Sequence, residues 1–233
     1  MLGAPKKVDL YLDAVEQWEA THDGRRPAAL ELTIELGKPL ELKAAGGWFG
    51  FLRQHDRLTA DEVAVFDKAS TLLLTIEHDH YTKSYKLVTL MAMQDLGGVS
   101  VPASLKGIAA NAKWRIFSDP RLMADIADAN SAFHDKWNPT SLEWEDYWRK
   151  NPINALIGGN KADANAWFEL DGSSLRCKVE VGDDLRDTFD AMVAEVVEYR
   201  LHRYLLGKAM ASERIERKVW SPAGVALEAT FVL

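Results

Sequence analysis

The stretch Asp183–Leu206, DDLRDTFDAMVAEVVEYRLHRYLL, has the strongest helical pattern in the chain. Its apolar residues recur every three or four positions, which places them in one wide stripe along a helix. They are Leu185, Phe189, Met192, Val193, Val196, Val197, Leu201, Tyr204 and Leu205. Positive charge gathers near the end of the stretch, at Arg200 and Arg203, where it interacts favourably with a helix dipole. The pattern predicts one long helix that closes the fold.

A β-hairpin is predicted directly before this helix. Two strand-like runs, Ala166–Leu170 and Leu175–Val181, flank the turn-forming sequence Asp-Gly-Ser-Ser. We expect Asp171, Gly172 and Ser173 to form the tip of the hairpin. The tail, Val225–Leu233, has the composition of a further strand that could pair with the hairpin.

Helices and a short extended segment precede the hairpin. The predicted elements are a helix over Tyr85–Leu96, an extended piece over Val99–Pro102, and helices over Ala103–Lys113 and Asp119–Asn130. An insertion containing Trp137, Trp144 and Trp148 follows. Helix, strand, two helices and hairpin is the order of a winged helix. The sequence therefore predicts a winged-helix-like domain over residues 82–233, although many α+β domains share this order.

The first 81 residues predict a separate helical subdomain. Short helices are expected over Lys6–Ala20, from Leu30 to Gly37, and through Trp48 and Leu52. Thr59 and Glu62 form a capping box that opens a longer helix ending near Glu77. A tri-helical DNA-binding unit and an ordinary small helical subdomain both fit this pattern. The predicted fold is α+β and mainly helical, with a boundary near Thr82.

Composition restricts the class of protein. The chain has 233 residues, 47% of them hydrophobic, and a net charge of −7. No apolar run reaches the roughly 18–20 residues of a membrane span. The single cysteine, Cys177, rules out an internal disulfide and fits a reducing compartment, so we expect a cytoplasmic protein. The negative charge argues against extensive nucleic-acid binding but allows a local basic cluster.

Catalytic and cofactor motifs are weak throughout. His78-Asp79-His80 could ligate a metal only if both histidines shared a strand face, because on a helix they diverge. A nuclease motif fails because Arg176, two residues before Lys178, cannot ligate Mg²⁺. Gly158-Gly159-Asn160-Lys161 lacks the spacing of a phosphate-binding loop. The sequence thus favours a protein without catalytic residues, metal or cofactor.

Basic residues mark a candidate DNA-binding face within the winged-helix-like half. They are Lys83, Lys86, Lys106, Lys113, Arg115 and Arg121, with Trp114 and Phe117 among them. Lysine and arginine contacts to phosphate, together with a wing, are how winged helices hold a duplex. The alternative interpretation is a solvated helical surface with Trp114 in the core.

Several segments resemble C-terminal extensions of bacterial DEAD/DEAH-type (superfamily 2) helicases. They are Thr82-Lys83-Ser84-Tyr85-Lys86, Asn151-Pro152-Ile153-Asn154-Ala155-Leu156, Trp167-Phe168-Glu169-Leu170-Asp171 and Val197-Glu198-Tyr199-Arg200-Leu201-His202-Arg203-Tyr204. The resemblance implies a DNA-binding accessory module of a helicase in a restriction or phage-defence system, with the ATP-binding motor elsewhere. The alternative is a protein docking module, whose aromatic surface would come from the tryptophans of the insertion.

Overall fold

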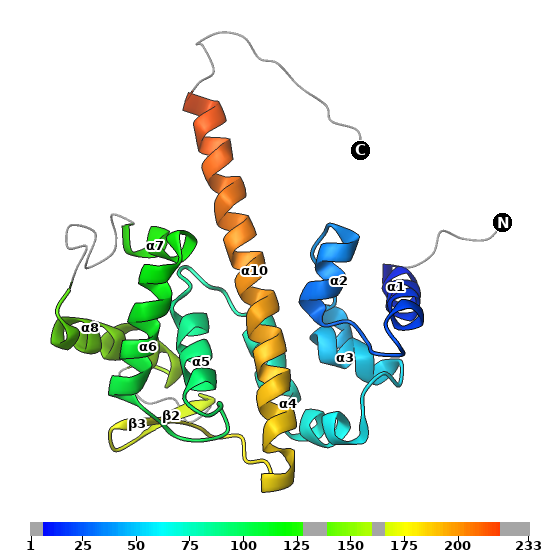
Figure 1. Ribbon diagram of the computed structural model, residues 1–233, viewed down its shortest axis with the longest axis horizontal. Helices are drawn as coiled ribbons and strands as arrows, with labels where there is room; N and C mark the ends of the chain where they lie inside the picture. Colours follow the sequence, from blue (N-terminus) through cyan, green and yellow to red (C-terminus); the bar gives the residue numbers. More distant parts are fainter. Residues whose placement is uncertain (1–6, 128–138, 160–165, 220–233) are drawn as a thin grey trace.

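The computed structural model describes residues 7–127, 139–159 and 166–219 (Figure 1). The first half contains α1 (Lys7–Thr21), α2 (Ala29–Leu36), η1 (Lys43–Ala45), α3 (Gly47–Gln54) and α4 (Ala60–His78). The second half contains α5 (Tyr85–Asp95), β1 (Ala103–Ser104), α6 (Leu105–Ser118), α7 (Pro120–Ala127), α8 (Ser141–Trp148), η2 (Arg149–Ile153), α9 (Asn154–Leu156), β2 (Phe168–Asp171), β3 (Ser174–Cys177), η3 (Asp183–Leu185) and α10 (Arg186–Val219). The fold is therefore mainly helical with a small sheet, as predicted.

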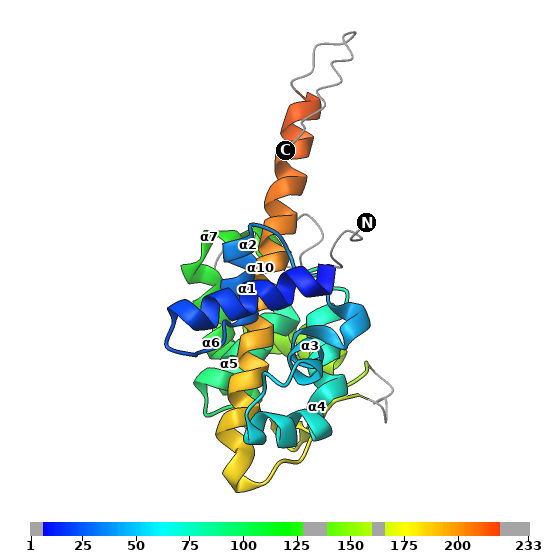
Figure 2. The same cartoon turned by 90° about the vertical axis from the view of Figure 1, so that its right-hand side faces the viewer.

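The long helix α10 runs through the middle of the molecule. It has 34 residues and is about 51 Å long at 1.5 Å per residue. Helices α1–α3 lie on one side of it and α5–α8 on the other, and its C-terminal end extends past both (Figures 1 and 2). It packs against α2, α4 and α5. One hydrophobic core results, which the predicted units 1–81 and 82–233 share.

Helix ends in the first half are fixed by the capping residues and glycines that the sequence shows there. Thr59 Oγ1 accepts from Glu62 N (3.2 Å) and Glu62 Oε2 accepts from Thr59 N (2.8 Å), so the predicted capping box is confirmed. Gly37 ends α2 in the left-handed conformation. At Gly47 a Cβ would lie 2.4 Å from the Glu77 carboxylate, so this approach requires glycine. Glu77 also accepts from Trp48 N (2.8 Å) at the start of α3.

The three strands form an antiparallel sheet in the order β1-β3-β2. The predicted hairpin is confirmed, with Gly172 in the left-handed conformation at its tip. The first strand lies at Ala103–Ser104 rather than over Val99–Pro102. Asp190 of α10 explains this correction: its carboxylate accepts from the backbone N–H groups of Val99 (2.6 Å) and Ser100 (2.8 Å). These donors are therefore not available to a sheet.

Several helix ends differ from their predicted positions. α6 continues to Ser118, beyond the predicted end at Lys113, and α10 continues beyond Leu206. The predicted end of the α7 helix at Asn130 and the predicted strand Val225–Leu233 lie outside the described residues. In the part of the chain that the structure describes, no helix combines the length and apolar character needed to cross a membrane.

Candidate functional site

The motif that carries the family resemblance, Thr-Lys-Ser-Tyr-Lys, folds around a buried carboxylate. Asp125 of α7 is 1% exposed, and it accepts from Ser84 N (2.7 Å) and Ser84 Oγ (2.6 Å). Tyr204 of α10 donates its hydroxyl to the same carboxylate (2.6 Å). The backbone carbonyl of Asp125 accepts from Lys83 Nζ (2.7 Å) and from the Tyr85 hydroxyl (3.1 Å). The motif thus joins α5, α7 and α10.

The six cations predicted to contact DNA differ in their surroundings. Lys83 is half-buried against α7, where its ammonium group binds the carbonyl described above. Lys86 pairs with Asp79 and lies over the Tyr81 ring. Arg115 pairs with Asp95 (2.5 Å), and Arg121 pairs with Asp119 (2.7 Å). Carboxylates of the protein itself therefore pair with three of the six.

Lys106 and Lys113 are brought together on α6. Seven residues separate them, which is about two helical turns, and both line the same cavity. Lys106 is exposed, while Lys113 Nζ donates to the Pro139 carbonyl (2.6 Å) and lies over the Phe117 ring (5.9 Å). Within the described residues, neither ammonium group forms an ion pair with a carboxylate.

The tip of the predicted wing is exposed but not basic. Asp171, Gly172 and Ser173 all lie at the surface. The Ser173 carbonyl accepts from Leu105 N (2.8 Å), which ties the tip to the start of α6. Behind the tip, Arg176 is paired with Glu169 across the hairpin. The only charged side chain at the tip itself is the carboxylate of Asp171.

The tryptophans predicted for an aromatic docking surface lie in the core. Trp144 is 1% and Trp148 0% exposed, because both face inward from α8 toward α5 and α6. Their indole N–H groups donate to the Ala109 carbonyl (2.8 Å) and to Thr89 Oγ1 (3.0 Å). Trp137 lies outside the described residues. The exposed side of α8 instead carries Glu143 and Asp146.

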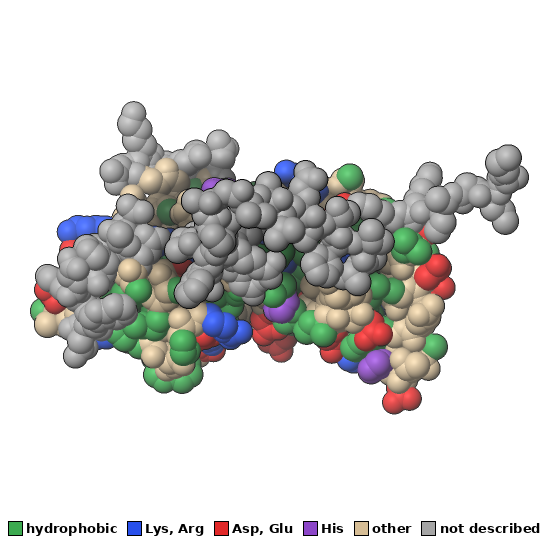
Figure 3. All heavy atoms as spheres, turned by 90° about the horizontal axis from the view of Figure 1, so that it is seen from above, with side chains coloured by type: hydrophobic (Ala, Val, Ile, Leu, Met, Phe, Trp, Pro, Cys, Tyr) green, Lys and Arg blue, Asp and Glu red, His purple; other side chains and the backbone are tan. Residues whose placement is uncertain are grey.

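Trp114 has the opposite environment. Its side chain is 66% exposed, so the interpretation that places it in the core is wrong. It borders a groove of about 500 Å³ between α6 and α8, a volume typical of ligand-binding clefts. The lining residues are Lys106, Ala109, Ala110, Lys113, Trp114, Phe117, Ser118, Ser141, Trp144 and Glu145. Figure 3 shows exposed hydrophobic side chains on this side of the molecule.

The groove residues on α6 follow one helix face. The spacing from Lys106 through Ala109, Ala110, Lys113 and Trp114 is three, one, three and one. The sequence contains this signal, but a helical stripe alone does not show whether it faces the core or solvent. Of the two alanines, Ala109 is buried and Ala110 is exposed. The Phe117 and Trp144 rings, which also line the groove, lie 5.7 Å apart.

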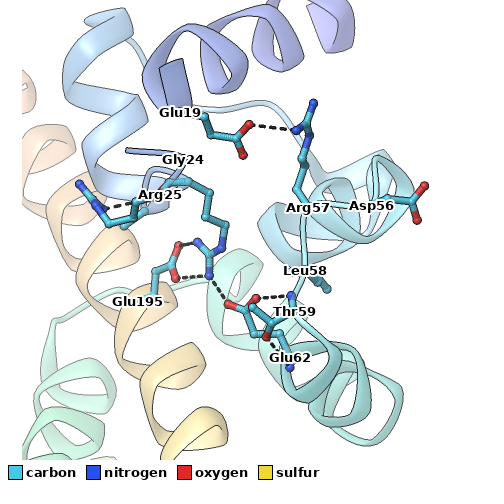
Figure 4. Close-up of a pocket in the computed structure, with 11 residues that line it drawn as sticks. Glu19, Gly24, Arg25, Asp56, Arg57, Leu58, Thr59, Glu62 and Glu195 are labelled. Atoms are coloured by element: carbon cyan, nitrogen blue, oxygen red, sulfur yellow. Dashed lines mark hydrogen bonds and ion pairs between the residues drawn. The ribbon is translucent and has the colours of Figure 1, made fainter. Parts of the chain in front are cut away.

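A second cavity, of about 660 Å³, lies among α1, α2, α4 and α10 (Figure 4). Arg26 bridges two carboxylates there: its guanidinium donates to Glu195 (3.1 Å) and to Glu62 (2.5 Å). Figure 4 shows these carboxylates approaching from α10 and α4. Arg57 pairs with Glu19 (2.9 Å). Arg25, the third arginine of the cavity, also pairs with a carboxylate. The arginines that line the cavity are therefore neutralised by carboxylates of the protein. These ion pairs hold the surrounding helices together.

Glu195 accepts four hydrogen bonds at the place where Arg26 connects α10 with α4, which we call the Arg26 junction. Besides Arg26, it accepts from Ala29 N (3.0 Å) at the start of α2 and from the indole N–H of Trp48. Burial alone lowers the pKa of Arg26, but Glu195 and Glu62 outweigh burial and raise that pKa, so the guanidinium stays charged. Sequence analysis missed Glu195 because it is a single acid in an apolar helical stretch.

The cysteine and the His78 motif, which could carry chemistry, do not form a reactive site among the described residues. Cys177 is buried in β3, and burial raises the pKa of its thiol to about 11, so the thiol is protonated at neutral pH. His78 ends α4, with its Nε2 3.2 Å from Glu77 Oε1. Among the side chains that the structure describes, no three from His, Cys, Asp or Glu come together as a metal site.

Comparison of the chain with protein-family models, curated proteins and solved structures finds no match.

Proposed function

We propose that this chain is a non-enzymatic docking module that binds a segment of a partner protein in the groove between α6 and α8. The observation that carries the proposal is Trp114, an exposed tryptophan beside an apolar groove. Tryptophan is the side chain most enriched among residues that dominate protein–protein binding energy. Contact with a partner would remove its apolar surface from water, as the hydrophobic effect favours.

The charge distribution supports a protein ligand over duplex DNA. Binding to duplex DNA draws much of its free energy from cations that neutralise phosphates. Here Lys86, Arg115 and Arg121 are already neutralised within the protein. The exposed side of α8 carries Glu143, and the hairpin tip carries Asp171, so both would repel phosphate. On the uncovered part of Figure 3, positive and negative side chains are interspersed.

A displayed library of random 16-residue peptides tests the proposal directly. Panned on the full chain, the library should yield enriched peptides, and Trp114→Ala should weaken their binding at least about 30-fold, as expected for a residue worth about 2 kcal/mol. Leu142→Ala is the matched control, because Leu142 is 79% exposed but does not line the groove. This control should bind like the wild type. An absence of enriched peptides, or equal binding by Trp114→Ala, would refute the docking function.

DNA binding is the second candidate function. It is supported by the order of α5, β1, α6 and α7, followed by β2 and β3 after the insertion that holds α8, η2 and α9, and by the strand order β1-β3-β2. This order fits a winged helix with the 171–173 turn as its wing. Under this function Lys106 and Lys113 would contact phosphate, and the helicase-associated setting stays a prediction from the resemblance. The chain would then act beside a helicase motor or another defence-system protein.

Fluorescence anisotropy with labelled duplex and single-stranded DNA at two salt concentrations separates the two functions. If the chain is a docking module, it should show no salt-dependent binding to either DNA. Micromolar binding that weakens steeply with salt, and that Lys113→Glu with Arg115→Glu reduces, would favour DNA instead.

A further inference from the structure

The shape of the groove restricts the kind of segment that fits it. The stripe from Lys106 to Phe117 spans 11 residue steps, or about 16 Å along the α6 axis. Two of its lining residues are alanines, whose small side chains allow a second backbone to approach closely. Trp114 and Phe117 stand at one end, where they can contact a large apolar side chain. An amphipathic helix laid along a groove presents apolar residues at positions i, i+3 or i+4, and i+7, which matches this surface.

Charges of opposite sign line the groove from its two helices. Lys106 and Lys113 belong to α6, and Glu145 belongs to α8. None of the three forms an ion pair with another described side chain. The two helices therefore present opposite charges to a ligand in the groove. Two lysines two turns apart match acidic residues seven positions apart on a bound helix.

We infer that the partner segment is an amphipathic helix with acidic residues along the side that faces α6, about one heptad apart. This inference rests on the proposed docking function and adds the conformation and charge of the ligand. The acids pair with Lys106 and Lys113, while apolar side chains contact Trp114 and the two alanines. Glu145 disfavours the reverse orientation, because it would meet the same acids across the groove.

The sequences of the selected 16-residue peptides test this inference. Wild-type chain should enrich peptides with apolar residues at helical spacing and with Asp or Glu seven positions apart on one flank. Lys106→Glu with Lys113→Glu should select the same apolar spacing with Lys or Arg in place of the acids. A synthetic acidic peptide should bind this double variant about tenfold more weakly, and a charge-reversed peptide should restore the loss.

Lys43→Glu with Lys68→Glu is the matched control, because it changes the net charge equally at exposed positions of η1 and α4. It should bind the acidic peptide like the wild type. Enriched peptides without an acidic preference, or with alternating apolar residues, would overturn the inference while leaving the docking function intact. Failure to enrich any peptide would remove both. Concentration-dependent dimerisation that Trp114→Ala abolishes would assign the groove to a second copy and overturn the inference.

Discussion

Arg26 and its neighbour Arg25 differ only in their surroundings. Arg26 is 17% exposed and lies between two carboxylates that are themselves almost buried, whereas Arg25 is 54% exposed and pairs with Glu31. Arg26→Ala should lower the free energy of unfolding by about 3–5 kcal/mol, because it leaves buried carboxylates unpaired. Urea denaturation followed by circular dichroism measures this change.

Arg25→Ala is the control for that measurement. An exposed ion pair contributes little to stability, because water and salt screen its charges, so this variant should unfold close to the wild-type midpoint. Equal effects of the two substitutions would show that the Arg26 junction does not stabilise the fold.

Two tyrosine hydroxyls allow a second comparison between single residues. Tyr204 donates to the buried carboxylate of Asp125 (2.6 Å), and Tyr81 donates to the uncharged carbonyl of Ile76 (3.0 Å). Hydrogen bonds to charged groups contribute about 1.5–3 kcal/mol and neutral ones about 0.5–1.5. Tyr204→Phe should therefore destabilise the protein more than Tyr81→Phe in the same denaturation assay. The reverse order would argue that the hydrogen bond to Asp125 stabilises the fold less than the bond to the Ile76 carbonyl.

At the scale of elements, the start of α4 should make stability depend on pH. Burial alone raises the pKa of Glu62, but hydrogen bonds from Arg26 and Thr59 outweigh it and hold the pKa below its ordinary value of 4.5. A carboxyl with a lowered folded-state pKa stabilises the fold above the unfolded-state pKa, and this contribution is lost as pH falls through the folded-state value. Glu62→Gln should therefore cost about 1–3 kcal/mol at neutral pH and progressively less below pH 4.5.

Unfolding free energies measured from pH 7 to pH 3 check this expectation. Glu35→Gln serves as the control, since Glu35 is exposed on α2 and makes the same change of charge. Its effect should stay near zero throughout. A difference between Glu62→Gln and wild type that is constant with pH would rule out the ionic role of this carboxylate.

The pair α6 and α8 shows how far element-level prediction extends. The helical stripe on α6 and the tryptophans of α8 are both evident in the sequence, but the sequence left open whether Trp114 lies in the core and whether Trp144 lies at the surface. The structure exposes Trp114 and buries Trp144. A helix face becomes buried only when another element covers it. Which element covers a face of α6 depends on packing with segments about 30 residues away in the sequence. The local spacing of apolar residues contains no information about such packing.

At the scale of the whole molecule, α10 should make unfolding cooperative. Its buried residues contact elements of both predicted units, and Val193 at its centre is 0% exposed. Val193→Ala should cost about 2 kcal/mol. In this variant, hydrogen exchange should show α3 and α6 losing protection at one and the same urea concentration, and that concentration should be lower than in the wild type. Met210→Ala, on an exposed part of the same helix, should have almost no effect. Loss of protection in only one half would indicate two independent units divided near residue 82.

The sequence by itself determined the features that depend on neighbours within a few residues: the Thr59 capping box, the glycine end of α2, the hairpin turn at Gly172 and the apolar stripe of α10. These follow from backbone geometry and helical spacing. Only the tertiary structure decided the roles of Glu195, Asp125 and Asp190, whose carboxylates bind groups 41 to 169 positions away. A buried acid needs such partners, and the chain brings them within reach only when it folds. The open groove beside Trp114 has the same origin, because exposure depends on which faces other elements cover.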